Sequence, residues 1–311
     1  MSTASVQTRL ATLGLDQKSP LSPLKPLTPS SLVIELLEKN NREHDIYFGP
    51  HLFHNHFPHT LLSQFALGAP ESRLKKEWEL EDYLKPLGEK QSTEITDDNW
   101  KDYIGIADFY HNYLDYFKDK IEKDGVQKTV LNYALDEILL PSIVSGAVHP
   151  LIHIGFGLEF SSEIVVAEGL AEGCVHSPSF APVVDIAMYS KSQTDKKSLL
   201  AIADEIYHDN AFDDVVKFKD FPKSEPVLKS KAATDAIKDY VMKWSFEETP
   251  EGLANAYSAL FELTTHFSVS SAFPPPRIAN DPKYKGKKLR PILDFFLMYK
   301  PVSIKLITAT L

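Results

Sequence analysis

A chain of 311 residues can form one large domain or two smaller ones, and its composition, 43% hydrophobic and 24% charged, is typical of globular proteins. The formal net charge of −10 argues against nucleic-acid binding, which depends on clustered Lys and Arg. Cys174 is the single cysteine, so an internal disulfide and a Cys-based zinc site are excluded. The first residues lack a secretory pattern, and no apolar run of about eighteen residues predicts a membrane span, so we expect a cytoplasmic protein.

The distribution of apolar residues predicts a mostly α fold. Residues 1–30 are rich in Ser, Thr and Pro and are expected to form a flexible arm. From residue 31 to 311, apolar residues recur at helical spacing and strand-type alternation is scarce, which indicates a single large helical domain. The predicted helices run from Ser31 towards Gly49 and over His59–Ala69, Trp100–Lys120, Val126–Leu140 (ended by Pro141), Ile143–Phe160, Glu163–His176, Lys196–His208, Ala232–Phe246 and Thr249–Phe267.

The histidines fall into groups whose spacing suits a shared metal ion. His149 and His153 are four apart, so on a helix both imidazoles lie on one face and can reach one ion. His56 and His59 are three apart and can do the same if a helix starts there. The alternative is that such histidines are core residues hydrogen-bonded to backbone or tyrosine. Two separate groups, together with His266 at the end of a helix, favour the metal, whose identity imidazole ligands alone leave open.

Neighbouring residues rank these candidates. Pro150 suits a first helical turn, so the helix is expected to begin near His149, which makes His153 the better-defined ligand. His51 and His54 are interpreted as loop histidines.

A rival group consists of Glu168, Glu172 and His176, spaced by four. They could build a carboxylate-bridged metal site or form a solvated polar stripe. We favour the stripe for Glu172, and expect Glu168 and His176 to orient a ligand.

Other chemistries have little support. The sequence contains neither a Gly-x-Ser-x-Gly elbow nor a phosphate-binding loop of the Gly-x4-Gly-Lys-Ser/Thr type. Gly155 and Gly157 lack the third glycine and the preceding strand of a dinucleotide site, and are interpreted as a helix-packing feature. Cys174 and His176 are two apart, so on a helix they point in different directions and make a poor nucleophile–base pair.

Several segments together resemble the questin oxidase-like family, which is known from fungal polyketide pathways. The most specific is the His149-Pro-Leu-Ile-His153 block. The resemblance covers most of residues 30–299 and is carried by Asn55–Ala69, Gly146–Phe160, Val166–His176, Leu263–His266 and Leu293–Met298.

This resemblance implies an oxidoreductase of secondary metabolism, a Baeyer–Villiger-like oxidase that uses molecular oxygen and NADPH on an anthraquinone or related aromatic polyketide. It also implies a non-haem metal, and a histidine-bound iron with open positions would activate oxygen without flavin. The candidate metal ligands are His56, His59, His149, His153 and His266. Two alternatives are a catalytically inactive helical scaffold and a helical zinc hydrolase built on the same histidines.

The C-terminal end departs from the family pattern. After the run ending at Met298 the family has a histidine and a Ser/Asn-rich stretch, whereas Tyr299 stands here and the match ceases from Lys300. We therefore expect a C-terminal part that is truncated or altered after Met298.

Overall fold

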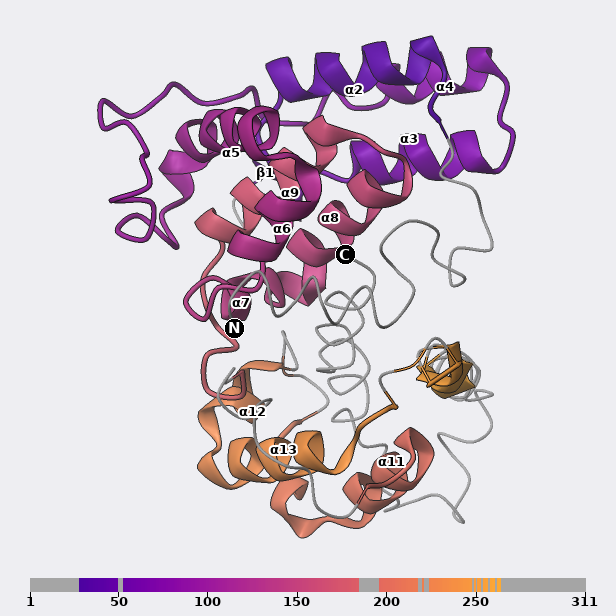
Figure 1. Cartoon of the computed structure of the whole chain (residues 1–311), viewed down its shortest axis with the longest axis vertical. Coiled ribbons are helices and arrows are strands. Elements are labelled where there is room, and N and C mark those ends of the chain that lie inside the picture. The colour runs from indigo at the N-terminus through magenta and orange to yellow at the C-terminus, as the bar shows by residue number, and fades with distance from the viewer. Residues whose placement is uncertain are drawn as a thin grey trace. The chain divides into compact units, whose positions relative to one another are not determined.

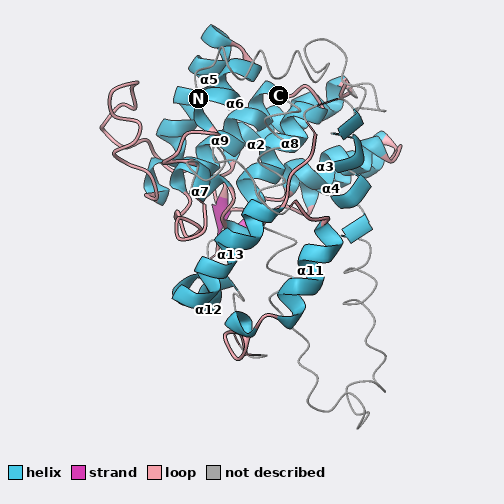
Figure 2. Ribbon diagram, turned by 60° about the horizontal axis from the view of Figure 1, so that its bottom comes forward, coloured by secondary structure: helices cyan, strands magenta, loops and turns pink. Residues whose placement is uncertain are grey.

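The computed structural model describes residues 28–49, 53–184, 196–217 and 220, 224–247, and most of 249–263. Within these ranges the chain is mostly helical, as predicted (Figure 2). Most of the expected arm at 1–30, the end of the helix expected at Thr249–Phe267, the candidate ligand His266 and the change expected after Met298 lie outside them.

The described residues divide into two compact units, one ending at Ala181 and the other beginning at Pro182. In the first unit a two-stranded antiparallel hairpin follows the first helix (Figure 1). Its elements are α2 (Ser31–Glu43), β1 (Tyr47–Phe48), β2 (Phe53–His54), α3 (Phe57–Ala66), α4 (Glu71–Glu79), η1 (Ala107–Phe109), α5 (Tyr110–Asp124), α6 (Val126–Tyr133), α7 (Leu140–Ile143), η2 (Gly146–Val148), α8 (His149–Glu159) and α9 (Glu163–Val175).

The second unit contains α11 and α13, which pack against each other. The ammonium group of Lys243 on α13 donates to the carboxylate of Glu205 on α11 at 2.9 Å. Lys197, which lies just before α11, donates to the same carboxylate. The described elements of this unit are α11 (Leu199–His208), η3 (Asn210–Phe212), α12 (Ser224–Lys229) and α13 (Lys231–Lys243).

Helix α2 forms where the sequence supplies both a cap and an apolar face. The Ser30 hydroxyl accepts a hydrogen bond from the backbone N–H of Val33 at 3.4 Å, which satisfies one of the free donors of the first turn. Val33, Leu36 and Leu37 are buried in a core that α3 and α4 also line. The first helix therefore fixes the position of α3, which carries two of the candidate histidines.

Helix α9 lies at the centre of the first unit, with every residue from Val165 to Val175 buried. It packs against α5 and α8, and two glycines bring it close to α8. A Cβ at Gly169 would lie 2.7 Å from the backbone N of Ile154, and one at Gly157 would lie 2.6 Å from the backbone N of Val166. Because both obstacles are backbone atoms, the two helices can approach this closely only with glycine at these positions.

Three predicted helices are corrected. Trp100–Phe109 is turn and 3₁₀ structure, because Gly105 has a positive φ of 85° and donates its N–H to the Cys174 carbonyl at 2.7 Å instead of to a helical carbonyl. The helix predicted over Val126–Leu140 ends already at Tyr133, and Pro141 lies in the first turn of α7, where a missing N–H costs no hydrogen bond. The helix predicted over 143–160 is not continuous: α7 ends at Ile143, and α8 begins only at His149.

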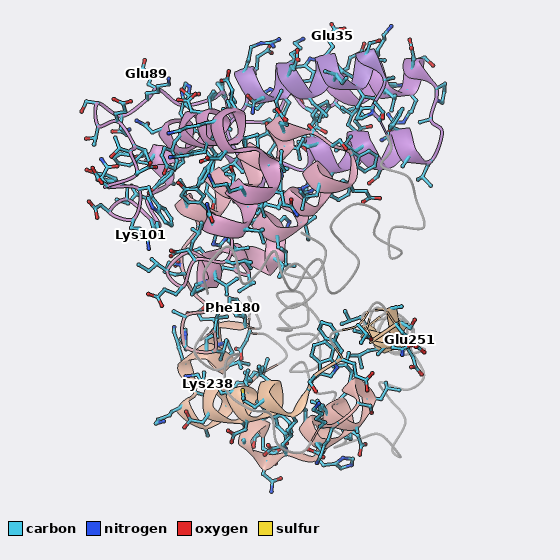
Figure 3. All side chains as sticks on the ribbon, viewed as in Figure 1. Glu35, Glu89, Lys101, Phe180, Lys238 and Glu251 are labelled. Carbon is cyan, nitrogen blue, oxygen red and sulfur yellow. The ribbon has the colours of Figure 1, made fainter. Side chains whose placement is uncertain are left out.

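The exterior of the first unit is charged, with Glu35, Glu89 and Lys101 exposed at its periphery (Figure 3). Among the described residues, no helix combines the length and the apolar character that crossing a membrane requires.

Candidate functional site

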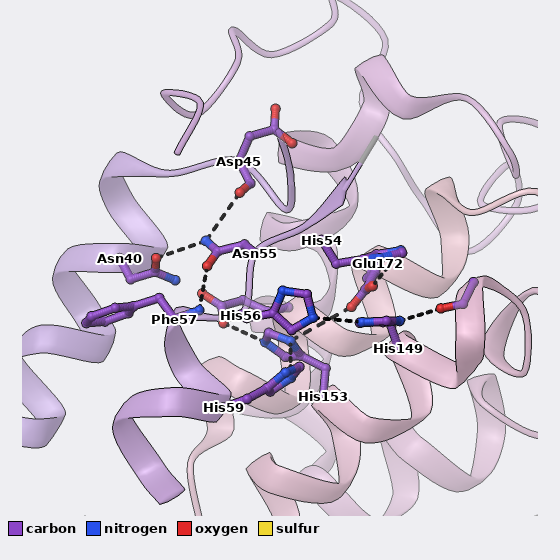
Figure 4. A network of polar contacts seen from close by, with 12 residues as sticks. Asn40, Asp45, His54, Asn55, His56, Phe57, His59, His149, His153 and Glu172 are labelled. Atoms are coloured by element: carbon purple, nitrogen blue, oxygen red, sulfur yellow. Dashed lines mark hydrogen bonds and ion pairs between the residues drawn. The ribbon is translucent and has the colours of Figure 1, made fainter. Parts of the chain in front are cut away.

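Five of the candidate and neighbouring histidines meet between the β2–α3 segment and α8 (Figure 4). His54 ends β2, His56 caps α3 and His59 lies in its first turn, whereas His149 and His153 lie one turn apart on α8. The sequence prediction that α8 begins at His149, with Pro150 in its first turn, is confirmed.

The histidines of α3 and α8 form two close pairs. His56 Nε2 lies 2.9 Å from His149 Nε2, and His59 Nε2 lies 3.1 Å from His153 Nδ1. Four of the five predicted ligands are thus brought together, and the two histidines of each pair are 93 or 94 residues apart in the chain.

His54 was interpreted from the sequence as a loop histidine, and this is wrong. Strand β2 turns its ring onto that of His149, with ring centroids 4.0 Å apart and 11° between the planes. The ring of His176, which follows the end of α9, is also stacked with that of His54, with centroids 5.4 Å apart and 8° between the planes. The ring of His54 is therefore stacked with two other imidazoles.

Glu172 was expected on a solvated stripe, and this is also wrong. Its side chain is 1% exposed, because α9 is enclosed on all sides by the elements packed around it. Among the described residues, neither carboxylate oxygen of Glu172 has a hydrogen-bond partner; His54 Nε2 lies 3.5 Å from Oε1 and His153 Nδ1 lies 3.8 Å from Oε2. A buried carboxylate without partners is costly, so its retention here needs a reason beyond packing.

Glu168 is buried to the same degree as Glu172, but both of its oxygens have partners. Asn41 Nδ2 donates to Oε1 at 2.8 Å, and His153 Nε2 lies 2.9 Å from Oε2. The expectation that Glu168 orients a histidine is in keeping with this contact.

A buried amide fixes the entry to α3. Asn55 donates through Nδ2 to Asn40 Oδ1 at 2.9 Å and to the Asp45 carbonyl at 3.3 Å, and its Oδ1 accepts from the Phe57 N–H at 3.0 Å (Figure 4). Asn55 therefore ties the first turn of α3 to α2 and to the segment before β1, and with it the flanking His54 and His56.

Burial favours the neutral form of His54, His56, His59, His149 and His176. Burial, aided by the neighbouring imidazoles, lowers the pKa of His54 and of His59 to about 2. Burial also lowers the pKa of His56, His149 and His176 below the usual value. A neutral imidazole carries the lone pair that a metal ion needs.

Burial and the charge of Glu168 act in the opposite direction on Glu172, and raise the pKa of its carboxyl well above the usual range. The proton that this carboxyl holds would be displaced by a cation placed between it and the histidines.

The donor set fits a metal ion in kind, with imidazoles and one carboxylate whose oxygens have no hydrogen-bond partner in the described part of the chain. As the side chains stand, no three such donors in the described part of the chain are grouped closely enough to hold an ion. The two His–His pairs are the units that could close on one.

Sequence reasoning missed two functional positions here. Asn41 follows Val33 and Leu37 at intervals of four on the buried face of α2, and a polar residue in that apolar series was a usable signal. His54 precedes His56 by two, but only the hairpin pairing of Tyr47 with His54 shows which way its ring points.

The chain is similar to one protein family and to several curated proteins. The family model described as questin oxidase-like matches residues 53–309. Curated relatives include a Baeyer-Villiger oxidase of Pestalotiopsis fici, 33% identical over 55% of this chain and 42% of its own length, and one of Pestalotiopsis microspora, 30% identical over 66% and 49%. The questin oxidase of Aspergillus fumigatus is 29% identical over 57% of this chain and 41% of its own length.

In these alignments the chain spans less than half the length of each of the three relatives. The match of the family model nevertheless extends over most of the chain and includes every histidine of the described cluster. The chain belongs to the questin oxidase-like family.

Proposed function

We propose that the chain is an oxidoreductase that carries out oxygen-dependent oxidation or ring cleavage of an anthraquinone-type aromatic polyketide at a histidine-bound non-haem iron. The relatives named as Baeyer-Villiger oxidases and as a questin oxidase support the reaction class. The observation that carries the metal part is the pair of His–His contacts beside the unpartnered carboxylate of Glu172.

The residues that would hold the ion are His56 and His149 from one pair and His59 and His153 from the other, with Glu172 beside them. His266, which the sequence also nominates, lies outside the described residues. A bound iron with open coordination positions would supply the activation of oxygen that flavin supplies in other oxidases.

The chain's own contribution is to keep the donors neutral and fixed. Burial lowers the pKa of His56, His59 and His149, so these imidazoles keep the lone pair that a metal ion needs. Phe156 stacks on His59 with centroids 4.9 Å apart and 25° between the planes, which places an apolar aromatic face beside the cluster. Such a face suits a flat aromatic substrate better than a sugar or a phosphate. NADPH as the electron source is proposed on the family resemblance alone.

The test is metal analysis by mass spectrometry of the purified full chain, combined with turnover of an anthraquinone panel with and without oxygen and with and without NADPH. We expect bound iron and turnover that requires oxygen. His153→Ala should lose the iron, whereas His208→Ala should retain it, because the His208 side chain is 67% exposed on α11 in the other unit.

Three results would contradict the proposal. Folded wild-type protein without metal or turnover would indicate an inactive scaffold. Bound zinc with hydrolysis that needs neither oxygen nor NADPH would indicate a hydrolase. Unchanged iron in His153→Ala would remove the histidine cluster from the metal site.

A further inference from the structure

The two histidines of α8 use different nitrogens for their outward contacts. His149 Nδ1 contacts the backbone carbonyl of Gly146, and its Nε2 faces His56. His153 has the reverse arrangement, with Nε2 on the carboxylate of Glu168 and Nδ1 facing His59.

These contacts determine where each ring carries its proton. A backbone carbonyl can only accept a hydrogen bond, so His149 must donate from Nδ1, and its lone pair is on Nε2. Glu168, as a carboxylate, has only acceptor oxygens, so His153 donates to it from Nε2. The proton of His153 is therefore on Nε2, and its lone pair is on Nδ1.

The acceptor of His153 is itself held in place. Asn41 of α2 donates to the second oxygen of Glu168 at 2.8 Å, and the side chains of Asn41, Glu168 and His153 are buried. The glycine contact between α8 and α9 leaves no room for adjustment, because a Cβ at Gly169 would lie only 3.2 Å from the backbone carbonyl carbon of His153.

We propose that α8 presents its two histidines in opposite tautomers, His149 through Nε2 and His153 through Nδ1, and that Glu168 and Asn41 are the positioning residues that fix His153. This arrangement lets residues one helical turn apart, which leave the helix in similar directions, direct lone pairs into one cluster from different sides of their rings. The assignment of these lone pairs to a metal rests on the proposed function, whereas the tautomers are a property of the chain alone.

The test is a long-range proton–nitrogen NMR correlation on the full chain labelled with ¹⁵N-histidine, freed of metal with EDTA, at about pH 7.5, where histidines are mostly neutral. His149→Gln and His153→Gln identify the two ring signals by their loss. The expected spectrum has the proton on Nδ1 for His149 and on Nε2 for His153. The same tautomer for both residues would overturn the proposal.

Matched variants separate positioning from packing. Glu168→Met keeps the length of the side chain but removes the acceptor, so His153 should shift its proton to Nδ1, facing His59 Nε2. Glu168→Gln keeps one acceptor oxygen and should retain the Nε2 proton. Glu172→Met is one turn away and equally buried but has no hydrogen bond to lose, so it should leave the His153 tautomer unchanged.

An unchanged Nε2 proton in Glu168→Met, or an equal shift in Glu172→Met, would overturn the role of Glu168. If Glu168→Met does not fold, Asn41→Leu replaces it, since loss of the Asn41 contact should increase the proportion of the Nδ1-protonated form. An Asn41→Leu spectrum identical to that of the wild type would then remove Asn41 from the proposal.

A zinc titration monitored by the same spectra connects the tautomers to the metal. Zinc should shift Nε2 of His149 and Nδ1 of His153, and its affinity should fall about 10–100-fold in Glu168→Met, as when other carboxylate partners of metal-bound histidines are lost. Wild-type spectra that do not respond to zinc would contradict the proposed metal centre, while the tautomers measured without metal would still decide the present proposal.

Discussion

Asn55 shows how much one buried side chain can determine at the site. Its amide donates twice and accepts once, to groups on α2, the segment before β1 and the first turn of α3. It also separates His54 from His56, so its position fixes where both rings begin. A polar residue used this fully stabilises the fold and orders the cluster together.

Asn55→Ala should lower the free energy of unfolding by roughly 2–4 kcal/mol, because three hydrogen bonds are lost and buried groups on Asn40 and Phe57 lose partners. Urea denaturation measures the change. Asn210→Ala is the control, since its exposed side chain should change stability by less than about 0.5 kcal/mol. Equal effects of the two substitutions would contradict the role given to Asn55.

The lowered histidine pKa values predict acid sensitivity of the metal-free protein. His54 and His59 have a pKa of about 2 in the folded chain and a usual value of 6.5 when unfolded. Above pH 6.5 both are neutral in either state; as the pH falls below 6.5 only the unfolded chain takes up protons. Each therefore removes about 1.4 kcal/mol of stability per pH unit in that window.

Glu172 has the opposite sign. Because its pKa is raised, the folded chain keeps a proton that the unfolded chain loses above the usual 4.5, so its contribution falls as the pH rises. The uptake of two histidine protons by the unfolded chain outweighs the effect of the one carboxyl proton. The net free energy of unfolding should therefore fall as the pH is lowered from about 6.5 to 5. Urea titrations across this range provide the measurement, and His59→Gln should reduce the slope. A flat profile would contradict the prediction.

At the scale of elements, the contact between α8 and α9 controls the site. His149 and His153 project from one helix and Glu168 and Glu172 from the other, so their distances depend on how closely the helices approach. Gly169 allows this close approach, because a Cβ atom at this position would collide with the backbone N of Ile154.

Gly169→Ala should lower the free energy of unfolding by about 1–3 kcal/mol, since the added methyl group meets backbone that can move only with its helix. Gly155→Ala is the matched control on α8, because a Cβ there has nothing within 4 Å. It should be neutral or stabilise by up to about 1 kcal/mol through better helix propensity. Thermal and urea denaturation of both variants test the difference, and equal responses would remove the packing argument.

At the scale of the whole molecule, a metal at this cluster would link segments that are distant in the sequence. The donors come from the start of α3 near residue 56, from α8 near residue 150 and from α9. A ligand that binds these groups only in the folded chain stabilises that chain by mass action.

The free energy of unfolding of the full chain should therefore rise by about 2.7 kcal/mol when free metal exceeds its dissociation constant 100-fold. The measurement compares melting temperatures of EDTA-treated and iron-reloaded protein. His208→Ala should retain the shift, whereas His153→Ala should lose it. A melting temperature that is independent of metal in the wild type would contradict a metal site in this cluster.

Much of the helical fold could be predicted because apolar spacing and local breakers are encoded within short segments. The sequence indicated α8 from His149 and Pro150, and the helix that carries Glu168 and Glu172. It missed α4 and α12, and it extended a helix through Trp100–Phe109. That segment bonds its Gly105 N–H to the carbonyl of Cys174, which no local pattern shows.

What the sequence by itself determined is the family, the mostly α class and the spacing of the histidines, since these depend on residue identity and local order. Tertiary structure alone decided which histidines meet, that His54 joins them, and that Glu172 is buried beside them. It also decided how the His149 and His153 pair is used: spacing of four predicts a shared face, but the proton on each ring is set by Gly146 and by Glu168. Such partners are long-range or depend on backbone geometry, and packing brings them into contact only after the helices have formed.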